Sequence, residues 1–396
     1  MEMSELTALL TPEGLRLLDA TPPVESAADV AREVTRLRAA GHSPDLVSAV
    51  VGQSRLRRRA RAKFGDLAAR MLFTRAGLEQ STRLSVSTLH ARRFRDAGIA
   101  SVADLGCGIG GDALGAAGLG LDVHAVEADE VTAALAAFNL APFGETARVS
   151  NALADSIDLG PEVGVWLDPA RRTAGRTETT RLSDPDEYSP TLSWAFEVAE
   201  RRATGIKLGP GLDRDLIPVG AEAQWITVDG STIELVLWSR ELARPGIGRA
   251  AVVLTDGGAH ELTAEHDAPD EDVSALGAFV HEPAGSVIRA RLIGDVARSL
   301  QAGPIAPGIA YLTGDAALTS PFVSTFRVRE VLPTDTKKIA RALRERGIGT
   351  LEIKKRGVDV DPAVLRTRLR LQGPESATLL LTRAGGGRLA ILADRV

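Results

Sequence analysis

The chain has few cysteines and no long apolar run, which disulfide-stabilised and membrane-spanning proteins respectively require. Among its 396 residues there is one cysteine, Cys107, so no disulfide can form within the chain. No window approaches the run of about 18 apolar residues that a membrane-spanning helix needs. Glu2 and Glu5 stand where a secretory signal would carry basic residues, so no such signal is expected. These absences favour a cytoplasmic protein with no membrane partner.

Metal-ligating side chains are also scarce. The sequence has six histidines and one cysteine, and they do not recur at the spacing of a zinc site. His90, His124, His260 and His266 have no recognisable partners in the sequence, so they are expected to be structural or surface residues. No metal is predicted.

The net charge of −5 hides two basic segments. Residues 51–98 contain twelve Lys or Arg against three Asp or Glu, and residues 325–396 contain sixteen against eight. Two basic segments around an acidic centre are typical of a protein that binds a polyanion. Solvated helix faces would give the same counts, and charge alone does not separate the two interpretations.

A glycine-dense turn is the most informative feature of the chain. An apolar strand is predicted over 101–105, and it is followed by glycines at 106, 108, 110 and 111 and then by an Ala-rich helix. A second apolar strand, 122–126, ends at Glu127, which is placed to accept hydrogen bonds from a ribose. This order is typical of a nucleoside-cofactor half-site. A glycine turn without a ligand and a dinucleotide site are the alternatives.

The strands that follow narrow the choice of cofactor. Further strands are predicted over 147–150, 163–167, 204–208, 224–228 and 233–238, and the last two are joined by Asp229-Gly230, a strong hairpin signal. A parallel sheet that closes with an antiparallel hairpin is not expected of a dinucleotide dehydrogenase. Asp104, two residues before the first glycine, would also repel a pyrophosphate.

The segment Asp104–Asp112 resembles the first motif of class I S-adenosylmethionine (SAM) methyltransferases, which have a Rossmann-like, seven-stranded α/β sheet ending in such a hairpin. The resemblance implies that Asp104, Gly106, Gly108 and Gly110 hold the methionine part of SAM. Glu127 would then hold the ribose, and Asp155, just after the third strand, would hold the adenine amine. A helix-capping role for Asp155 remains open.

A second motif, Asp168-Pro169-Ala170-Arg171-Arg172, ends the fourth strand. It resembles the Asp/Asn-Pro-Pro-aromatic motif of methyltransferases that act on nitrogen, which implies that Asp168 and Pro169 orient the target amine. Arg171 or Arg172 stands in place of the aromatic residue and could stack on a base or grip a phosphate. Lys207, at the end of the fifth strand, could meet a substrate phosphate or lie on the surface. Cys107 lies within the turn, where it is poorly placed to serve as a nucleophile.

Four segments follow from these patterns. Residues 1–98 are predicted to be a helical N-terminal domain, and residues 99–241 the SAM-binding methyltransferase domain. Residues 242–325 are predicted to be a connecting α/β segment, in which 251–254 and 309–312 are strands, Glu261–Asp272 is a loop, and 287–292 is a strand or the start of a helix. Residues 326–396 are predicted to form a small α/β domain with an exposed basic edge.

Taken whole, the chain resembles a bacterial family of class I methyltransferases with a THUMP-like C-terminal domain. The residues behind this are the blocks 78–82, Asp104–Asp112, 168–172 and 351–359. THUMP domains elsewhere bind RNA, so the resemblance implies an enzyme that methylates a base nitrogen in tRNA or rRNA. A small-molecule or protein acceptor, or an RNA-binding protein without activity, remains open, and the oligomeric state is not indicated. The expected phosphate contacts are these residues: Lys337, Lys338, Arg341, Arg344, Lys354, Lys355 and Arg356.

Overall fold

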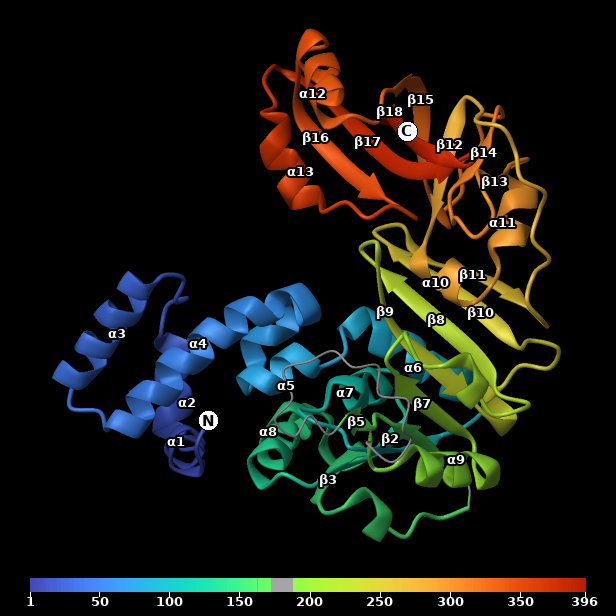
Figure 1. The fold of residues 1–396 in the computed structure, drawn as a ribbon. Coiled ribbons are helices and arrows are strands. Elements are labelled where there is room, and N and C mark those ends of the chain that lie inside the picture. Colours follow the sequence, from blue (N-terminus) through green and yellow to red (C-terminus); the bar gives the residue numbers. More distant parts are fainter. Residues whose placement is uncertain (162, 172–187) are drawn as a thin grey trace. The chain divides into compact units, whose positions relative to one another are not determined.

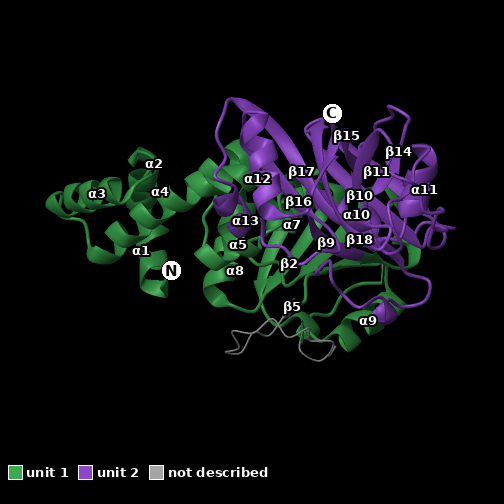
Figure 2. Cartoon of the chain, turned by 45° about the horizontal axis from the view of Figure 1, so that its top comes forward, with its two compact units in different colours: residues 1–208, 237–243 green, residues 209–236, 244–396 purple. Residues whose placement is uncertain are grey.

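The computed structural model describes residues 1–161, 163–171 and 188–396 (Figure 1). The predicted contact residue Arg172 and the side chain of Arg171 lie outside the described part. The chain divides into two compact units, coloured separately in Figure 2. The first comprises residues 1–208 and 237–243, and the second comprises residues 209–236 and 244–396.

The first unit begins with helices, as the sequence predicts. Their starts are capped by side chains: the hydroxyls of Thr11, Ser26 and Ser43 each accept a hydrogen bond from the backbone of the first turn. The helices of this segment are α1 Met3–Leu9, α2 Pro12–Ala20, α3 Ala27–Ala39, α4 Pro44–Phe64, the 3-10 turn η1 Gly65–Arg70, α5 Arg75–Gln80 and α6 Leu84–Asp96.

Five parallel strands follow, in the order β3-β2-β1-β4-β7. They are β1 Ser101–Leu105, β2 Asp122–Glu127, β3 Ala147–Asn151, β4 Gly164–Leu167 and β7 Thr204–Leu208, each within two residues of its predicted range. The connecting elements are α7 Gly111–Gly118, α8 Glu130–Leu140, the 3-10 turns η2 Ala141–Thr146 and η3 Ala154–Ser156, the strand pair β5 Ala170–Arg171 and β6 Tyr188–Ser189, and α9 Leu192–Arg201. Because the strands are parallel, their carboxyl ends meet at one edge, where the predicted site residues lie.

Buried polar side chains join the helical segment to this sheet. Gln53 on α4 exchanges two hydrogen bonds with the backbone of Phe73, at 2.7 and 3.0 Å. Asn139 on α8 does the same with Leu72, at 2.8 and 3.0 Å. The Lys63 ammonium, near the end of α4, donates to three carbonyl oxygens at the end of α5. The segment before α6 is therefore held firmly beside the sheet.

The second unit contains the hairpin that the sequence predicts. Its strands are β8 Glu222–Val228 and β9 Ser231–Trp238, and the last two residues of β9 belong to the first unit. Asp229 and Gly230 both have positive φ, 50° and 75°, as a two-residue type I′ turn requires. Within the first unit, Ser239 donates its backbone N–H to Thr204, so the chain after β9 runs beside β7.

Beyond the predicted seven strands, two more extend this hairpin within the second unit. β10 Arg249–Thr255 lies parallel to β8, and β11 Gly258–Ala264 pairs with β10 in the antiparallel direction. The expected loop over Glu261–Asp272 is therefore wrong at its start. The expected strand over 309–312 is also displaced, since β14 is Leu312–Gly314, and the undecided segment 287–292 begins inside helix α10, Gly285–Arg289.

A second sheet has the strand order β13-β14-β12-β15-β18-β17-β16. Helices α12 Thr336–Glu345 and α13 Pro362–Leu369 cover one face of it, where Ile339 and Leu365 pack on Leu351 and Leu379. Its remaining elements are β12 Phe279–Pro283, α11 Ile293–Ser299, β13 Gly303–Pro304, β15 Val323–Leu332, β16 Ile348–Lys355, β17 Glu375–Ala384 and β18 Gly387–Arg395, with 3-10 turns η5 Arg214–Leu216 before β8 and η6 Arg240–Leu242 after β9. No helix in the described ranges is long and apolar enough to cross a membrane.

Candidate active site

The glycine turn lies between β1 and α7 and is held from both sides. The backbone N–H groups of Gly106 and Cys107 both donate to the carbonyl oxygen of Val126 on β2. Gly106, Gly108 and Gly110 have φ of 91°, 55° and 86°, a region that side chains other than glycine rarely adopt. A Cβ on Gly108 would find no atom within 4 Å. The turn thus presents bare backbone to open space, which fits the predicted methionine part of SAM.

Glu127 fixes the far side of this turn. One of its carboxylate oxygens accepts from the backbone of Gly108 at 3.0 Å, and the other accepts from Asp129 at 2.9 Å. Asn151, after β3, donates to the carbonyl oxygens of Glu127 and Ala128, each at 2.9 Å. Glu127 therefore stands rigidly at the end of β2, where a ribose ligand is predicted. Its role toward ribose stays a prediction.

Asp155 lies exposed in η3, after β3, at the same edge of the sheet. Its position leaves the carboxylate accessible, as contact with an adenine amine would require, and that contact also remains a prediction.

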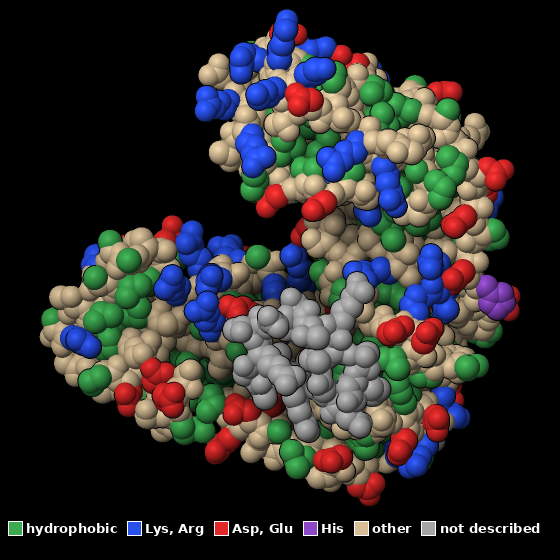
Figure 3. Space-filling view, viewed as in Figure 1, with side chains coloured by type: hydrophobic (Ala, Val, Ile, Leu, Met, Phe, Trp, Pro, Cys, Tyr) green, Lys and Arg blue, Asp and Glu red, His purple; other side chains and the backbone are tan. Residues whose placement is uncertain are grey.

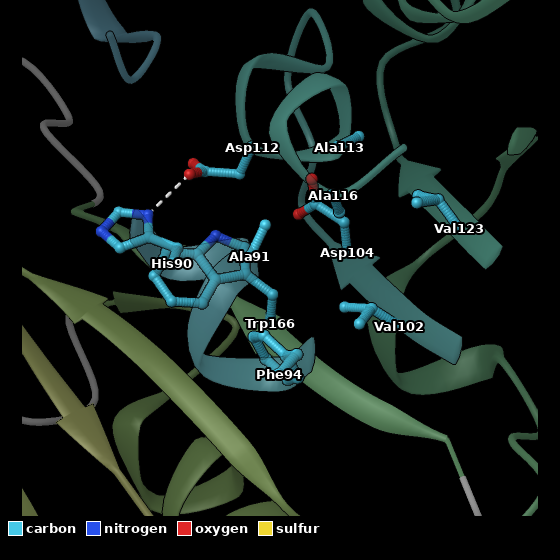
Figure 4. A pocket seen from close by; sticks show the side chains of 10 residues that line it. All are labelled: His90, Ala91, Phe94, Val102, Asp104, Asp112, Ala113, Ala116, Val123 and Trp166. Atoms are coloured by element: carbon cyan, nitrogen blue, oxygen red, sulfur yellow. Dashed lines mark hydrogen bonds and ion pairs between the residues drawn. The ribbon is translucent and has the colours of Figure 1, made fainter. Parts of the chain in front are cut away.

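Asp104 is placed differently from these residues. It is 2% exposed, and in Figure 4 its carboxyl group points into a small pocket between β1 and the helices α6 and α7. Burial, together with the charges of Asp112 and Asp168, raises its pKa well above the usual value. One oxygen, Oδ2, has no hydrogen-bond partner in the described part of the chain. The structure therefore places Asp104 beneath the turn, where burial disfavours its ionised form, and not on the open side of the turn.

Asp168 and Pro169 lie directly after β4, beside the glycine turn. A Cβ on Gly106 would lie 3.7 Å from the carbonyl oxygen of Asp168, so the two segments approach closely. The Asp168 side chain is 37% exposed, whereas Pro169 is buried. Asp168 can therefore present a hydrogen-bond acceptor next to the predicted cofactor site.

Lys207, predicted as a possible phosphate contact, is mostly buried at the end of β7. Its ammonium lies 2.6 Å from Oδ2 of Asp168, and it donates to the hydroxyl of Thr82 at 3.2 Å. Its side chain is only 12% exposed. This position favours a role inside the site over direct contact with an incoming phosphate.

The hydrogen bonds continue from Thr82 to a histidine that the sequence analysis treated as structural or as a surface residue. The Thr82 hydroxyl donates to Oδ2 of Asp112 at 2.7 Å, and Nδ1 of His90 lies 2.8 Å from Oδ1 of the same carboxylate. The contact between His90 and Asp112 is the dashed line in Figure 4. Burial alone would raise the pKa of Asp112, but the hydrogen bonds from His90 and Thr82 and the charges of His90 and Lys207 lower it. His90 also stacks on Trp166, with ring centroids 4.3 Å apart. No signal in the sequence joins these residues, because they come from four separate elements.

Cys107 lies within the turn and is buried. Burial raises the pKa of its thiol well above the usual value, and the acidic side chains of Asp104 and Glu127 nearby raise it further. The thiol therefore stays protonated and is a poor nucleophile, in agreement with the sequence analysis. Among the described residues no group of His, Cys, Asp and Glu side chains could hold a metal ion.

The predicted phosphate contacts of the second unit differ in how accessible they are. Lys354 on β16 and Arg356 just after the strand are half-buried and pair with Glu282, at 2.5 and 3.5 Å, while Lys355 between them is exposed. On α12, Lys337, Lys338 and Arg344 are exposed, and Arg341 pairs with Glu345 at 2.7 Å. Figure 3 shows the Lys and Arg side chains gathered over α12 and α13.

Two families and several known proteins are similar to this chain. Residues 323–395 match the family described as THUMP domain-like, and residues 2–60 match a family described as a domain of unknown function. Two proteins of Mycobacterium tuberculosis, from strains CDC 1551 / Oshkosh and ATCC 25618 / H37Rv, are named "uncharacterized S-adenosylmethionine-dependent methyltransferase". Each is 33% identical to this chain over 364 residues, which cover 90% of this chain and 97% of the relative.

A solved structure named "putative methyltransferase from Porphyromonas gingivalis W83" shares the fold, with a TM-score of 0.69 and 20% identity over 94% of this chain and 100% of its own. The predicted class I methyltransferase fold, the THUMP-like domain and the predicted cofactor, SAM, are thus confirmed. Since a third of the sequence is shared along almost its whole length, the chain belongs to the S-adenosylmethionine-dependent methyltransferases.

Proposed function

We propose that this enzyme transfers the methyl group of SAM to a nitrogen of a base in tRNA or rRNA. The observation that carries the proposal is the position of Asp168, a partly exposed acceptor directly beside the glycine turn. A carboxylate at this place can accept a hydrogen bond from the N–H of an acceptor base. Such a contact orients the nitrogen lone pair, and orientation of this kind supplies a large share of rate enhancement.

Different residues around the turn would hold different parts of the cofactor. Bound SAM supplies an electrophilic methyl group on a sulfonium. The backbone of Gly106, Gly108 and Gly110 would contact its methionine part, Glu127 its ribose and Asp155 its adenine. Asp104 would support the glycine turn from below, because its carboxyl group accepts a hydrogen bond from the backbone of Ala113 at the start of α7. Pro169, buried after Asp168, would fix the backbone there.

The exposed cations of the second unit support RNA as the acceptor. Lys337, Lys338 and Arg344 lie on one helix of a domain that matches the THUMP-like family, and such cations bind phosphates. Lys355 would join them. Lys354 and Arg356 would contribute less, because Glu282 already balances their charge. Cys107, the single cysteine, supports the predicted cytoplasmic location.

The test uses SAM labelled in its methyl group and total RNA from a strain that lacks this protein. The wild-type enzyme is expected to label RNA, and Asp168→Ala is expected to label none while it still binds SAM. Nucleoside analysis of the labelled RNA then identifies the base. Asp158→Ala, an exposed aspartate in the loop before β4, serves as the matched control and should label RNA like the wild type.

Two outcomes would favour the alternatives. SAM binding without label in RNA, but with label in a protein or small-molecule fraction, would replace RNA as the acceptor. RNA binding with no methyl transfer to any fraction would indicate an RNA-binding protein that keeps the methyltransferase fold.

A further inference from the structure

A closed ring of side chains lies behind Asp168. It passes from Asp168 to Lys207, to Thr82, to Asp112 and to His90. His90 then stacks on Trp166 of β4, and the backbone from Trp166 to Asp168, two residues further along and just after the strand, closes the ring. All these residues belong to the first unit.

The strand register explains why the ring starts where it does. β4 and β7 are parallel neighbours, and Leu167 pairs with Ile206. The next residues along the two strands, Asp168 and Lys207, therefore lie side by side, and side chains at paired positions point to the same face. A mostly buried ammonium needs compensating partners, and Asp168 and Thr82 provide them.

The hydrogen bonds of the ring can run in one direction only. An ammonium has no acceptor, so Lys207 donates to the Thr82 oxygen. The Thr82 hydroxyl is then free to donate its own hydrogen to Asp112, at 2.7 Å. The lowered pKa of Asp112 keeps that carboxylate ionised, so the nearby His90 Nδ1 carries a hydrogen and donates to it. Each member thereby fixes the orientation of the next.

The segment that carries Thr82 is itself held in place. A Cβ on Gly111 would lie 3.3 Å from the backbone nitrogen of Thr82, so the segment packs tightly on the start of α7. The Lys63 ammonium binds the carbonyl oxygens of Leu78, Glu79 and Ser81 just before it. Thr82 is 6% exposed and cannot move far.

From this geometry we propose that Lys207 is a positioning residue for Asp168, and that Thr82, Asp112 and His90 hold Lys207 in the position that this requires. The proposal rests on the proposed function of Asp168. Lys207 fixes one carboxylate oxygen and thereby the plane of the Asp168 side chain, whose exposed part faces the acceptor. It also balances the Asp168 charge beside two further acids, Asp104 and Asp112.

The decisive variant is Thr82→Val, which keeps the shape of the side chain but removes both hydrogen bonds. With SAM and total RNA from the deletion strain, kcat is expected to fall by about tenfold to a hundredfold, as misplacement of a catalytic group does. KM for SAM and the affinity for SAM should stay near the wild-type values, whereas the melting temperature should fall by a few degrees, because the buried Lys207 and Asp112 side chains each lose a hydrogen bond. Thr82→Ser keeps the hydroxyl and should restore most of kcat. Thr88→Val on α6, where the hydroxyl bonds to the backbone of its own helix, is the matched control.

A double-mutant cycle shows whether Thr82 acts through Asp168. In an Asp168→Asn background the ion pair with Lys207 is gone, so Thr82→Val should change the residual kcat by less than about twofold. An equal loss in both backgrounds, or a Thr82→Val enzyme as fast as Thr82→Ser, would overturn the positioning role while leaving the RNA acceptor intact.

Absence of label in RNA with the wild type would overturn the proposed acceptor and not the ring. In that case a crystal structure of the wild type with S-adenosylhomocysteine decides the matter without any acceptor. Lys207 within ion-pair distance of Asp168 and bonded to Thr82 supports the proposal. A Lys207 side chain turned to solvent contradicts it.

Discussion

Asn139 on α8 donates a hydrogen bond of 2.9 Å to the carbonyl oxygen of Ile109, in the middle of the glycine turn. The same side chain exchanges two hydrogen bonds with the backbone of Leu72, and it is 3% exposed. One buried amide therefore joins three segments: the N-terminal helices, the cofactor turn and α8. Because no water can replace these bonds, removing them should be costly.

Asn139→Ala is expected to lower the free energy of unfolding by at least about 2 kcal/mol, since it leaves three buried backbone groups without a partner. Urea denaturation followed by circular dichroism measures the change. Asn151→Ala is the matched control, because Asn151 also makes two hydrogen bonds to backbone but is exposed, and water can take its place. Equal losses of stability in the two variants would show that burial is not what makes Asn139 important.

Glu127→Ala is expected to weaken SAM binding by about tenfold or more, as the removal of charge-assisted hydrogen bonds does. The variant would also lack the hydrogen bonds to the backbone of Gly108 and Asp129, so the turn itself should loosen. Isothermal titration calorimetry with SAM measures the affinity. Glu130→Ala, three residues further along and exposed, should bind like the wild type. Unchanged affinity of Glu127→Ala would remove the ribose assignment.

The burial of Asp104 predicts that the stability of the protein depends on pH. Burial raises its pKa in the folded protein, whereas its pKa in the unfolded chain is about 3.9. The neutral carboxyl group therefore contributes its full stability below pH of about 4, and the contribution is lost as the pH rises toward the raised pKa. Asp104→Asn cannot ionise, so its stability relative to the wild type should increase with pH above about 4, by at most about 1.4 kcal/mol per pH unit.

Urea denaturation of both proteins between about pH 5 and pH 8 tests this. Asp122→Asn, at an exposed aspartate at the start of β2, is the matched control over the same pH range. A stability difference for Asp104→Asn that is flat or falls with pH would mean that Asp104 is ionised in the folded protein.

The sheet of the first unit was predictable because its strands are short apolar runs, and several of them are followed by a glycine turn or end beside an acidic residue. Leu105 leads into glycines, β2 ends at Glu127 and β4 leads into Asp168. β11 was missed for the opposite reason. It is an edge strand whose side chains, among them His260 and Glu261, are exposed or half-buried, so it has no apolar run.

The ring behind Asp168 was not predictable from one sequence, since its contacts join distant parts of the chain. Lys207 and Thr82 are 125 residues apart, and Thr82 and Asp112 are 30 apart. His90 has an ordinary helical setting, and only the fold brings it to Asp112. The contact between Asp168 and Lys207 did have a signal: each residue directly follows or closes a strand, and the two strands are neighbours in the methyltransferase order.

The exposed and paired lysines of the second unit should respond differently to substitution. Lys337→Ala together with Lys338→Ala is expected to weaken RNA binding. It should also reduce the slope of log affinity against log salt by about 1 for each phosphate that the protein no longer neutralises. The fold should tolerate the change, because both side chains are exposed. Electrophoretic mobility shifts of total tRNA at several salt concentrations measure the slope.

Lys354→Ala is the informative comparison, because Lys354 pairs with Glu282 and lies over the Phe326 ring. Its removal leaves a half-buried carboxylate with a weaker partner, so it should lower the melting temperature of the protein and leave the salt slope near the wild-type value. A Lys354→Ala protein that melts normally but no longer binds RNA would place the RNA contact on β16. In that case the Lys337 and Lys338 side chains of α12 would be merely solvated.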